Sequence, residues 1–246
     1  LNYQQQKMTK LSVNINKIAT IRNARGAETP SVTEAAIKIQ EFGGQGITIH
    51  PRPDERHITR KDVYDLKPLV YTEFNIDGNP HRPYIDMVLE VKPEQVTLVP
   101  DADDAITSNA GWDCEKNLDF LKSVISEFKN AGIRTSIFLD PNPEMVKFAA
   151  ETGTDRIELY TEAYARNYET DKEAAIKPYY ETAVEATKYD LGINAGHDLS
   201  LDNLKYFADN IPNLLEVSIG HALISEALYL GLENTIQAYL KRLAKW

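Results

Sequence analysis

The sequence predicts an α/β fold, a single-domain (β/α)8 TIM barrel with extra helices. Eight short apolar stretches rich in β-branched residues recur along 246 residues, and amphipathic helical patterns lie between them. The first stretch begins at residue 11 and the eighth at residue 216, so the mean interval is about 29 residues, enough for a strand, a helix and two loops. A doubly wound open sheet has the same local alternation, but the count of eight and the chain length favour the barrel.

The expected strands and helices follow from local signals. The strands cover residues 11–16, 46–50, 73–77, 95–100, 134–140, 156–161, 192–197 and 216–221. After the first strand, Ser31 begins a helix with Glu34 at the capping-box spacing, and Gly43 ends it. Since proline lacks a backbone N–H, we expect Pro178 to break the helical stretch that follows the sixth strand. A closing amphipathic helix over residues 221–246 is expected to be interrupted near Gly231.

No proline- or serine-rich linker divides the chain, so we expect one barrel domain over residues 11–246. Residues 1–10 are expected to be an N-terminal extension outside the fold. Within this extension, Met8 resembles a natural start.

Composition limits the classes of function. The formal charge is 27 − 37 = −10 and the pI is about 5.1, which argues against general binding to nucleic acid or to an anionic membrane. Cys114 is the single cysteine, so no internal disulfide can form, and we interpret it as a structural thiol. The chain has no apolar run of about 18 residues and no hydrophobic signal segment at its start. We therefore expect a cytoplasmic protein.

Acid–base and cationic side chains collect at or just after the ends of the expected strands. They are Asn14, Asn16, Lys17, His50, Arg52, Asp77, Thr107, Ser108, Asp140, Glu158, Asn194, His197 and His221. Because the C-terminal ends of barrel strands meet at one rim, these residues are expected to share a site. Histidines, carboxylates and fixed cations together favour general acid–base chemistry on an anionic substrate. A metal site is the alternative, but the histidines lack short paired spacings such as HxH, so we expect no metal.

Two further features indicate phosphate binding. Gly196 and Gly220 precede the last two histidines, in the loops that often hold phosphate in barrels, and we expect their missing Cβ atoms to let a ligand approach the backbone. Arg22 and Arg25 follow the first strand and, with Arg52 and Arg56, make a second phosphate site plausible. A pair of phosphorylated substrates fits this layout.

Several motifs, in the same order along the chain, resemble the pyridoxine 5′-phosphate synthase family. They are "VNINKIATIRNARG", "GITIHPRPDERHI", "VKPEQVTLVPD", "SIFLDP", "RIELYTEAYA", "INAGHDL" and "VSIGHALISEAL", within residues 11–239. The resemblance implies a (β/α)8 barrel, usually a homo-octamer. It also implies condensation of 1-deoxy-D-xylulose 5-phosphate with 3-amino-2-oxopropyl phosphate to pyridoxine 5′-phosphate, phosphate and water, with no metal or organic cofactor.

The resemblance also implies roles for particular residues. His50 matches the proton acceptor, His197 the proton donor, and Glu158 a carboxylate that stabilises transition states, while Asp77 stands where the family generally has a glutamate base. The residues that match contacts to the aminoketone phosphate are Asn14, Arg25, Asp198, Gly220 and His221. The residues that match contacts to the deoxyxylulose phosphate are Asn16, Lys17, Arg52, His57 and Ser108.

Two positions depart from the family pattern. Many members have Asp-His where this chain has Asn16 and Lys17, so a titrating group is lost while a cation remains. Aspartate at position 77 is one methylene shorter than glutamate, a displacement of roughly 1 Å, which can cost on the order of 10²-fold in rate.

Residues 101–111 are polar and follow the fourth strand, so we expect them to form a mobile lid. A tyrosine-rich stretch that contains Tyr164, Tyr168, Tyr179 and Tyr180 is a candidate subunit interface. Two rival functions remain open. One is an aldolase or isomerase that acts on a single sugar phosphate, although no expected strand contains the lysine that a Schiff base needs. The other is a catalytically silent phosphosugar-binding barrel.

Overall fold

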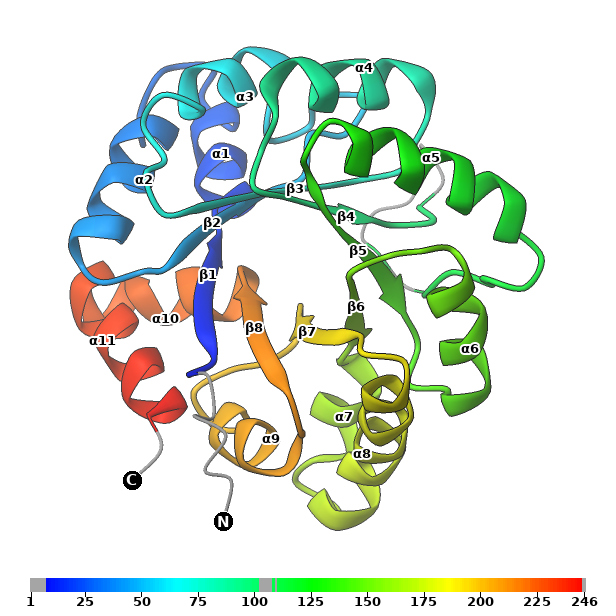
Figure 1. Ribbon diagram of the computed structural model, residues 1–246. Coiled ribbons are helices and arrows are strands. Elements are labelled where there is room, and N and C mark those ends of the chain that lie inside the picture. Colours follow the sequence, from blue (N-terminus) through cyan, green and yellow to red (C-terminus); the bar gives the residue numbers. More distant parts are fainter. Residues whose placement is uncertain (1–7, 102–107, 109, 245–246) are drawn as a thin grey trace.

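The barrel is closed by eight parallel strands in sequential order, β1 to β8, with β8 paired back to β1 (Figure 1). The computed structural model describes residues 8–101, 108 and 110–244. The strands are β1 (Lys10–Asn14), β2 (Gly46–Ile49), β3 (Glu73–Gly78), β4 (Gln95–Leu98), β5 (Arg134–Leu139), β6 (Arg156–Tyr160), β7 (Gly192–Gly196) and β8 (Leu214–Ile219). All eight expected strands are therefore confirmed, as is the barrel.

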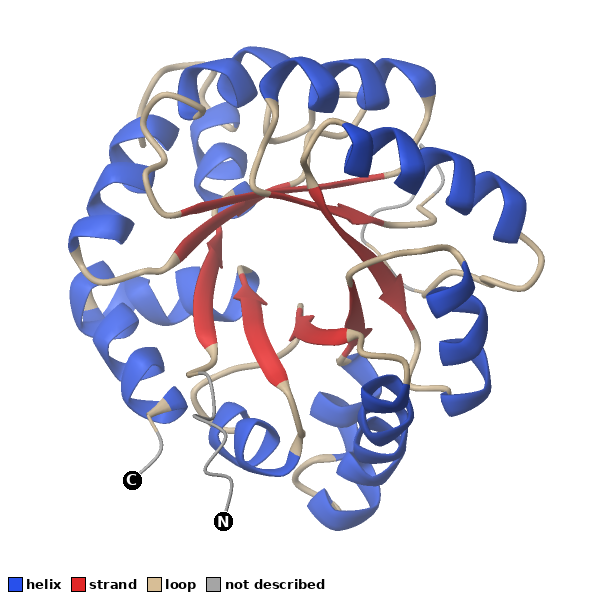
Figure 2. Ribbon diagram, in the orientation of Figure 1, coloured by secondary structure: helices blue, strands red, loops and turns tan. Residues whose placement is uncertain are grey.

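Helices form a ring outside the strands (Figure 2). They are α1 (Asn16–Asn23), α2 (Val32–Glu41), α3 (Arg60–Leu66), α4 (Arg82–Val91), α5 (Leu118–Asn130), α6 (Pro143–Glu151), α7 (Glu162–Asn167), α8 (Lys172–Lys188), α9 (Leu204–Asn210), α10 (His221–Leu230) and α11 (Leu232–Leu243). Ser31 caps α2, because its side chain accepts a hydrogen bond from Glu34 N. Among the helices described, none is long and apolar enough to cross a membrane.

Alternation along each strand separates an apolar layer from a polar barrel interior. In β2 and β3, for example, Ile47, Ile49, Phe74 and Ile76 are fully buried in the core, whose other members come largely from the surrounding helices. The alternate residues form polar contacts across the barrel interior: Ser12 with Thr48, Thr48 with Asn75, and Asn75 with Thr97.

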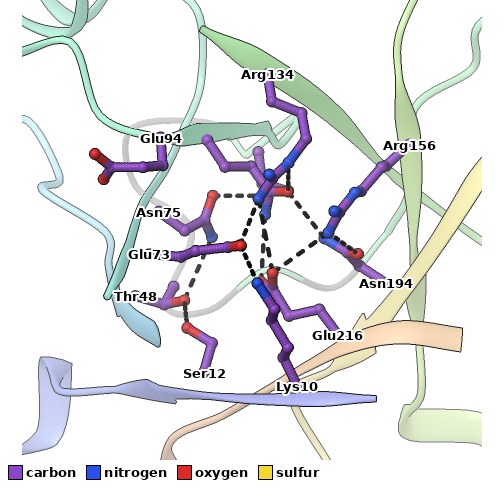
Figure 3. Close-up of polar contacts among 12 residues, drawn as sticks. Lys10, Ser12, Thr48, Glu73, Asn75, Glu94, Arg134, Arg156, Asn194 and Glu216 are labelled. Carbon is purple, nitrogen blue, oxygen red and sulfur yellow. Dashed lines mark hydrogen bonds and ion pairs between the residues drawn. The ribbon is translucent and has the colours of Figure 1, made fainter. Parts of the chain in front are cut away.

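The barrel interior carries charges near the N-terminal ends of the strands. Glu73 pairs with Lys10 and Arg134, and Glu216 lies within 3.4 Å of Arg156, as Figure 3 shows. The hydrophobic core therefore lies between strands and helices, and the barrel axis is polar.

Three sequence predictions need correction. The fold begins before residue 11, because β1 starts at Lys10 and the side chain of Thr9 donates to Leu214 O. The helix break after β6 lies at residues 168–171, and α8 continues through Pro178. The start of α8 is fixed instead by Asp171, whose side chain accepts hydrogen bonds from two backbone N–H groups.

The tyrosine-rich stretch is the third correction, in part. Tyr164 and Tyr179 are buried and pack edge-to-face on each other and on Phe207, so these rings belong to the subunit's own core. Tyr180 is 50% exposed, and for this residue a role between subunits stays a prediction. The expected interruption of the last helix is confirmed, because Gly231 separates α10 from α11 at a φ of 80°.

Candidate active site

A cavity of about 650 Å³ opens at the C-terminal ends of the strands. Thirteen of the fourteen predicted site residues line it: Asn14, Asn16, Lys17, His50, Arg52, His57, Asp77, Ser108, Glu158, His197, Asp198, Gly220 and His221. Asn14, Asp77 and Glu158 lie within β1, β3 and β6, and the other ten lie in the segments that follow β1, β2, β4, β7 and β8. Parallel closure of the barrel brings them together, because all the strands end at the same rim.

Arg25 is the exception. It is exposed, lies just after α1, and is not among the residues that line the cavity. Arg22 is not a free phosphate ligand either, because its guanidinium is paired with both Asp62 oxygens, at 2.5 and 2.8 Å. Of the four arginines expected to form a second phosphate site, Arg52 and Arg56 line the cavity, and the two that follow β1 do not.

His50 is held at the end of β2 by two asparagines. Its backbone N–H donates to Asn16 Oδ1 at 3.0 Å, and the backbone N–H of Asn16 donates to Asn14 Oδ1 at 3.0 Å. Burial and the nearby charge of Arg52 lower the pKa of His50 well below its usual value. The same two causes lower the pKa of His57 to about 4. Both imidazoles are therefore neutral near pH 7 and can accept protons.

Two buried carboxyl groups of the cavity, Asp77 and Glu158, have pKa values shifted in the opposite direction. Burial and the charge of Glu158 raise the pKa of Asp77 well above its usual value. Burial and the charge of Glu216 raise the pKa of Glu158 to about 7. Asn75 donates to Asp77 at 2.8 Å and Thr97 donates to Glu158 at 3.3 Å, so both side chains are oriented from the barrel interior. The cavity thus combines histidines whose pKa values are lowered with carboxyl groups whose pKa values are raised.

His197 follows β7 in a left-handed conformation, with a φ of 75°. Its backbone N–H donates to Ser218 O at 3.1 Å, and its ring packs against Phe138 and Tyr160 with centroids 6.0 and 5.9 Å away. His197 follows a strand that lies three positions around the barrel from β2, whose end carries His50. A base and a second histidine therefore approach one small ligand from different strands.

Gly196 and Gly220 lack a side chain for a different reason from the one expected. A Cβ on Gly196 would lie 2.1 Å from Ser218 O, and a Cβ on Gly220 would lie 3.0 Å from Asn14 Cβ. Their missing side chains allow neighbouring strands to pack, so a ligand is not needed to explain them. Gly220 nevertheless lines the cavity directly before α10, whose N-terminus has no side-chain cap and favours an anion there.

Sequence reasoning missed the aromatic walls. Phe138 and Tyr160 lie near the ends of β5 and β6 and line the cavity, as do Thr20, Val99, Glu162 and Ser218. Aromatic residues at the C-terminal end of a strand were the available signal for the first two. The predicted lid falls largely on residues 102–107 and 109, and these, with Thr107 among them, lie outside the described residues. Within the described ranges, no group of three His, Cys, Asp or Glu side chains has the arrangement of a metal site.

The fold and the site define the class of protein. A closed (β/α)8 barrel with histidines, buried carboxyl groups and cations at its mouth is a barrel enzyme of the general acid–base kind. The family model described as "Pyridoxal phosphate biosynthesis protein PdxJ" matches residues 11–245. The chain belongs to this family, and it is an enzyme of pyridoxine biosynthesis.

Relatives with high identity cover nearly the whole chain. A protein of Christiangramia forsetii named pyridoxine 5′-phosphate synthase is 66% identical over 236 residues, which are 96% of this chain and 100% of the relative. Proteins of the same name from Flavobacterium johnsoniae and Bacteroides thetaiotaomicron are 65% and 63% identical, over 96% and 94% of this chain and 100% and 98% of theirs.

Two solved structures of low sequence identity are similar to this chain in fold. Thiamine phosphate pyrophosphorylase from Pyrococcus furiosus has a TM-score of 0.61 at 12% identity and covers 97% of this chain and 96% of its own. A 3-keto-L-gulonate-6-phosphate decarboxylase from Vibrio cholerae has a TM-score of 0.62 at 9% identity, with 96% and 98% covered.

Proposed function

We propose that this chain condenses 3-amino-2-oxopropyl phosphate with 1-deoxy-D-xylulose 5-phosphate to give pyridoxine 5′-phosphate, phosphate and water. The names of the relatives support this reaction. The observation that carries it is one cavity lined by His50, Asp77 and His197, which arise from three different strands. No metal or organic cofactor takes part in the proposed chemistry.

The proposed proton transfers follow from the pKa shifts. The amine of one substrate attacks the ketone of the other, and loss of water gives an imine. His50 is neutral and buried, so it removes a proton from carbon. The pKa of Asp77 is raised, so we propose that it donates a proton first and acts as a base afterwards. Phosphate is then eliminated, and an aldol-type closure with loss of further water forms the aromatic ring. His197 donates a proton to a departing oxygen, and Glu158 stabilises the charge that develops during closure.

The two phosphates are proposed to bind at different walls. Arg52, His57 and Ser108, with Asn16 and Lys17 beside them, hold the phosphate of the deoxyxylulose substrate. The aminoketone phosphate lies near Asn14, Asp198, Gly220 and His221, where the N-terminus of α10 favours an anion. Arg25 lies outside this cavity, so we assign it no phosphate contact within a single subunit.

The test is an assay with purified protein and both substrates, in which pyridoxine 5′-phosphate is followed by absorbance. His50→Asn should lower kcat by at least about 10²-fold and leave the circular dichroism spectrum unchanged. His81→Asn is the matched control. His81 caps α4 and does not line the cavity, and asparagine is a good N-cap, so activity should be retained.

Other outcomes point to the rival functions. Binding of both substrates without turnover in the wild-type protein would support a silent phosphosugar-binding barrel. Turnover of one sugar phosphate alone would support an aldolase or isomerase. A His50→Asn variant with normal turnover would show that the base is a different group.

We further propose that the enzyme works as a homo-octamer in the cytoplasm, because the family resemblance implies this assembly. Small phosphorylated molecules are its proposed partners, without nucleic acid or membrane.

A further inference from the structure

Asp101 is a buried carboxylate beside the cavity that the proposed chemistry does not use. It lies three residues after the end of β4, and its Oδ2 atom accepts hydrogen bonds from Ser108 Oγ at 2.6 Å and from Arg52 Nη2 at 2.7 Å. Its backbone carbonyl accepts one from Asn79 at 2.9 Å. The side chains of Arg52 and Asp101 are only 5% and 3% exposed, so solvent screens their attraction weakly.

Arg52 and Ser108 line the cavity, and Asp101 engages both of them. A serine hydroxyl has a single proton, so Ser108 cannot donate to a ligand while it donates to Asp101. The charge of Arg52 is likewise balanced by the adjacent carboxylate. An internal anion therefore holds the two groups that face the cavity as anion donors.

We propose that Asp101 competes with a substrate phosphate for Arg52 and Ser108, and so makes this part of the cavity selective for dianions. The proposal rests on the proposed function, in which these two groups hold a phosphate. A phosphate monoester carries a charge of about −1.5 to −2 and three acceptor oxygens, so it can replace both hydrogen bonds and add others. A singly charged ion gains little over the carboxylate already present. Asp101 is thus a specificity residue that does not touch the reacting atoms.

Displacement of Asp101 follows from charge. A phosphate on Arg52 and Ser108 would lie beside the Asp101 carboxylate, and adjacent anions repel each other. The bound state therefore requires the Asp101 side chain to move away. In the empty protein the same carboxylate prevents Arg52 from being a buried charge without a partner, which would destabilise the fold.

The test is binding of inorganic phosphate, measured by calorimetry at pH 8 and constant ionic strength. Asp101→Asn retains an oxygen for Ser108 and removes the competing charge. We expect phosphate to bind this variant at least about tenfold more tightly than the wild-type protein. The variant should also melt at a lower temperature without phosphate, and phosphate should raise its melting temperature more than it raises that of the wild type. Chloride at the same ionic strength should not replace phosphate in this effect.

Asp54→Asn is the matched control. Asp54 pairs at 2.7 Å with Arg56, the other arginine that lines the cavity, but these side chains are 47% and 30% exposed. Phosphate affinity should change by less than about twofold, because exposed pairs contribute little.

The proposal is overturned if Asp101→Asn binds phosphate as weakly as the wild type or more weakly, because Asp101 would then only orient the two donors. It is also overturned if neither protein binds phosphate. If Asp101→Asn does not fold, Asp101→Ser gives the same readout. Since binding of phosphate needs no turnover, a protein that binds as expected but makes no product would contradict the proposed function alone.

Discussion

At the scale of single residues, burial in the cavity shifts the pKa values of side chains away from their values in water. The pKa of His50 is lowered and that of Glu158 is raised, and burial is the largest cause in both cases. Burial disfavours whichever form of a group is charged, so it yields neutral bases and neutral acids side by side. This arrangement suits proton transfer at neutral pH, but each shifted group also makes folding depend on pH.

Glu158→Gln should stabilise the folded protein at alkaline pH. The pKa of Glu158 is raised from 4.5 to about 7, so the folded state binds its proton more tightly than the unfolded state. Stability is therefore lost as pH rises from 4.5 through 7, and the loss amounts to about 3 kcal/mol above pH 7. Glutamine has no such proton and can still accept the hydrogen bond from Thr97. Urea unfolding should show the variant more stable by up to about 3 kcal/mol at pH 8, with the difference vanishing near pH 4.5.

Glu162→Gln is the comparison for this measurement. Glu162 lines the same cavity but is 38% exposed and paired with Arg166, so its replacement should change stability by less than about 0.5 kcal/mol at either pH. An equal effect of Glu158→Gln at both pH values would contradict the linkage argument.

At the scale of elements, the segment between β2 and α3 is held by residues distant in sequence. Arg22 of α1 pairs with Asp62 of α3 and donates to His57 O at 3.2 Å. Asp62 also completes a capping box with Thr59 at the start of α3. One carboxylate therefore fixes the start of a helix and, through Arg22, the loop that carries His57.

Arg22→Met should destabilise the protein by about 3 kcal/mol, because it leaves Asp62 as a buried charge without its partner. It should also raise the KM for the phosphorylated ketose more than it lowers kcat, since His57 lies in the cavity wall and is not the proposed base. The double variant Arg22→Met/Asp62→Asn should recover part of the lost stability in urea unfolding. Strictly additive losses in this cycle would mean that the two side chains are energetically independent.

The same segment shows what sequence can and cannot predict. The strands were found because β-branched runs have a short, regular signature, and their ends identified His50, Asp77, Glu158 and His197 as neighbours. Arg22 was assigned to phosphate because spacing cannot reveal a carboxylate partner 40 residues away. The missing side chain of Gly196 is evident in the sequence, but the carbonyl of Ser218 that requires it is not.

At the scale of the whole molecule, the barrel separates stability from chemistry. The apolar layer between strands and helices is continuous, while charges along the axis neutralise one another, such as Glu216 with Arg156 in Figure 3. Sequence reasoning did not predict this polar interior, because alternation along a strand does not tell which face is inside when both faces are buried. The negative charge of Glu216 also acts on Glu158, so the interior adjusts the active site.

The outer surface has an apolar patch, Leu228, Tyr229 and Leu230 at the end of α10, whose residues are 72%, 89% and 48% exposed. Ile21 of α1, a helix that packs against α10, is also exposed. Since exposed apolar side chains that lie together usually mark a contact with another protein, this patch is a better candidate for self-association than the buried tyrosines.

Tyr229→Asp should therefore shift the proposed octamer toward smaller species in analytical ultracentrifugation, because it introduces a charge into an interface that would have to desolvate it. Tyr71→Asp is the control: Tyr71 is 68% exposed in the loop after α3, and its replacement should leave the sedimentation coefficient unchanged. Far-ultraviolet circular dichroism should be the same for both variants, because neither side chain is packed in the core. Identical sedimentation of Tyr229→Asp and wild-type protein across a dilution series would exclude this patch from the subunit contacts.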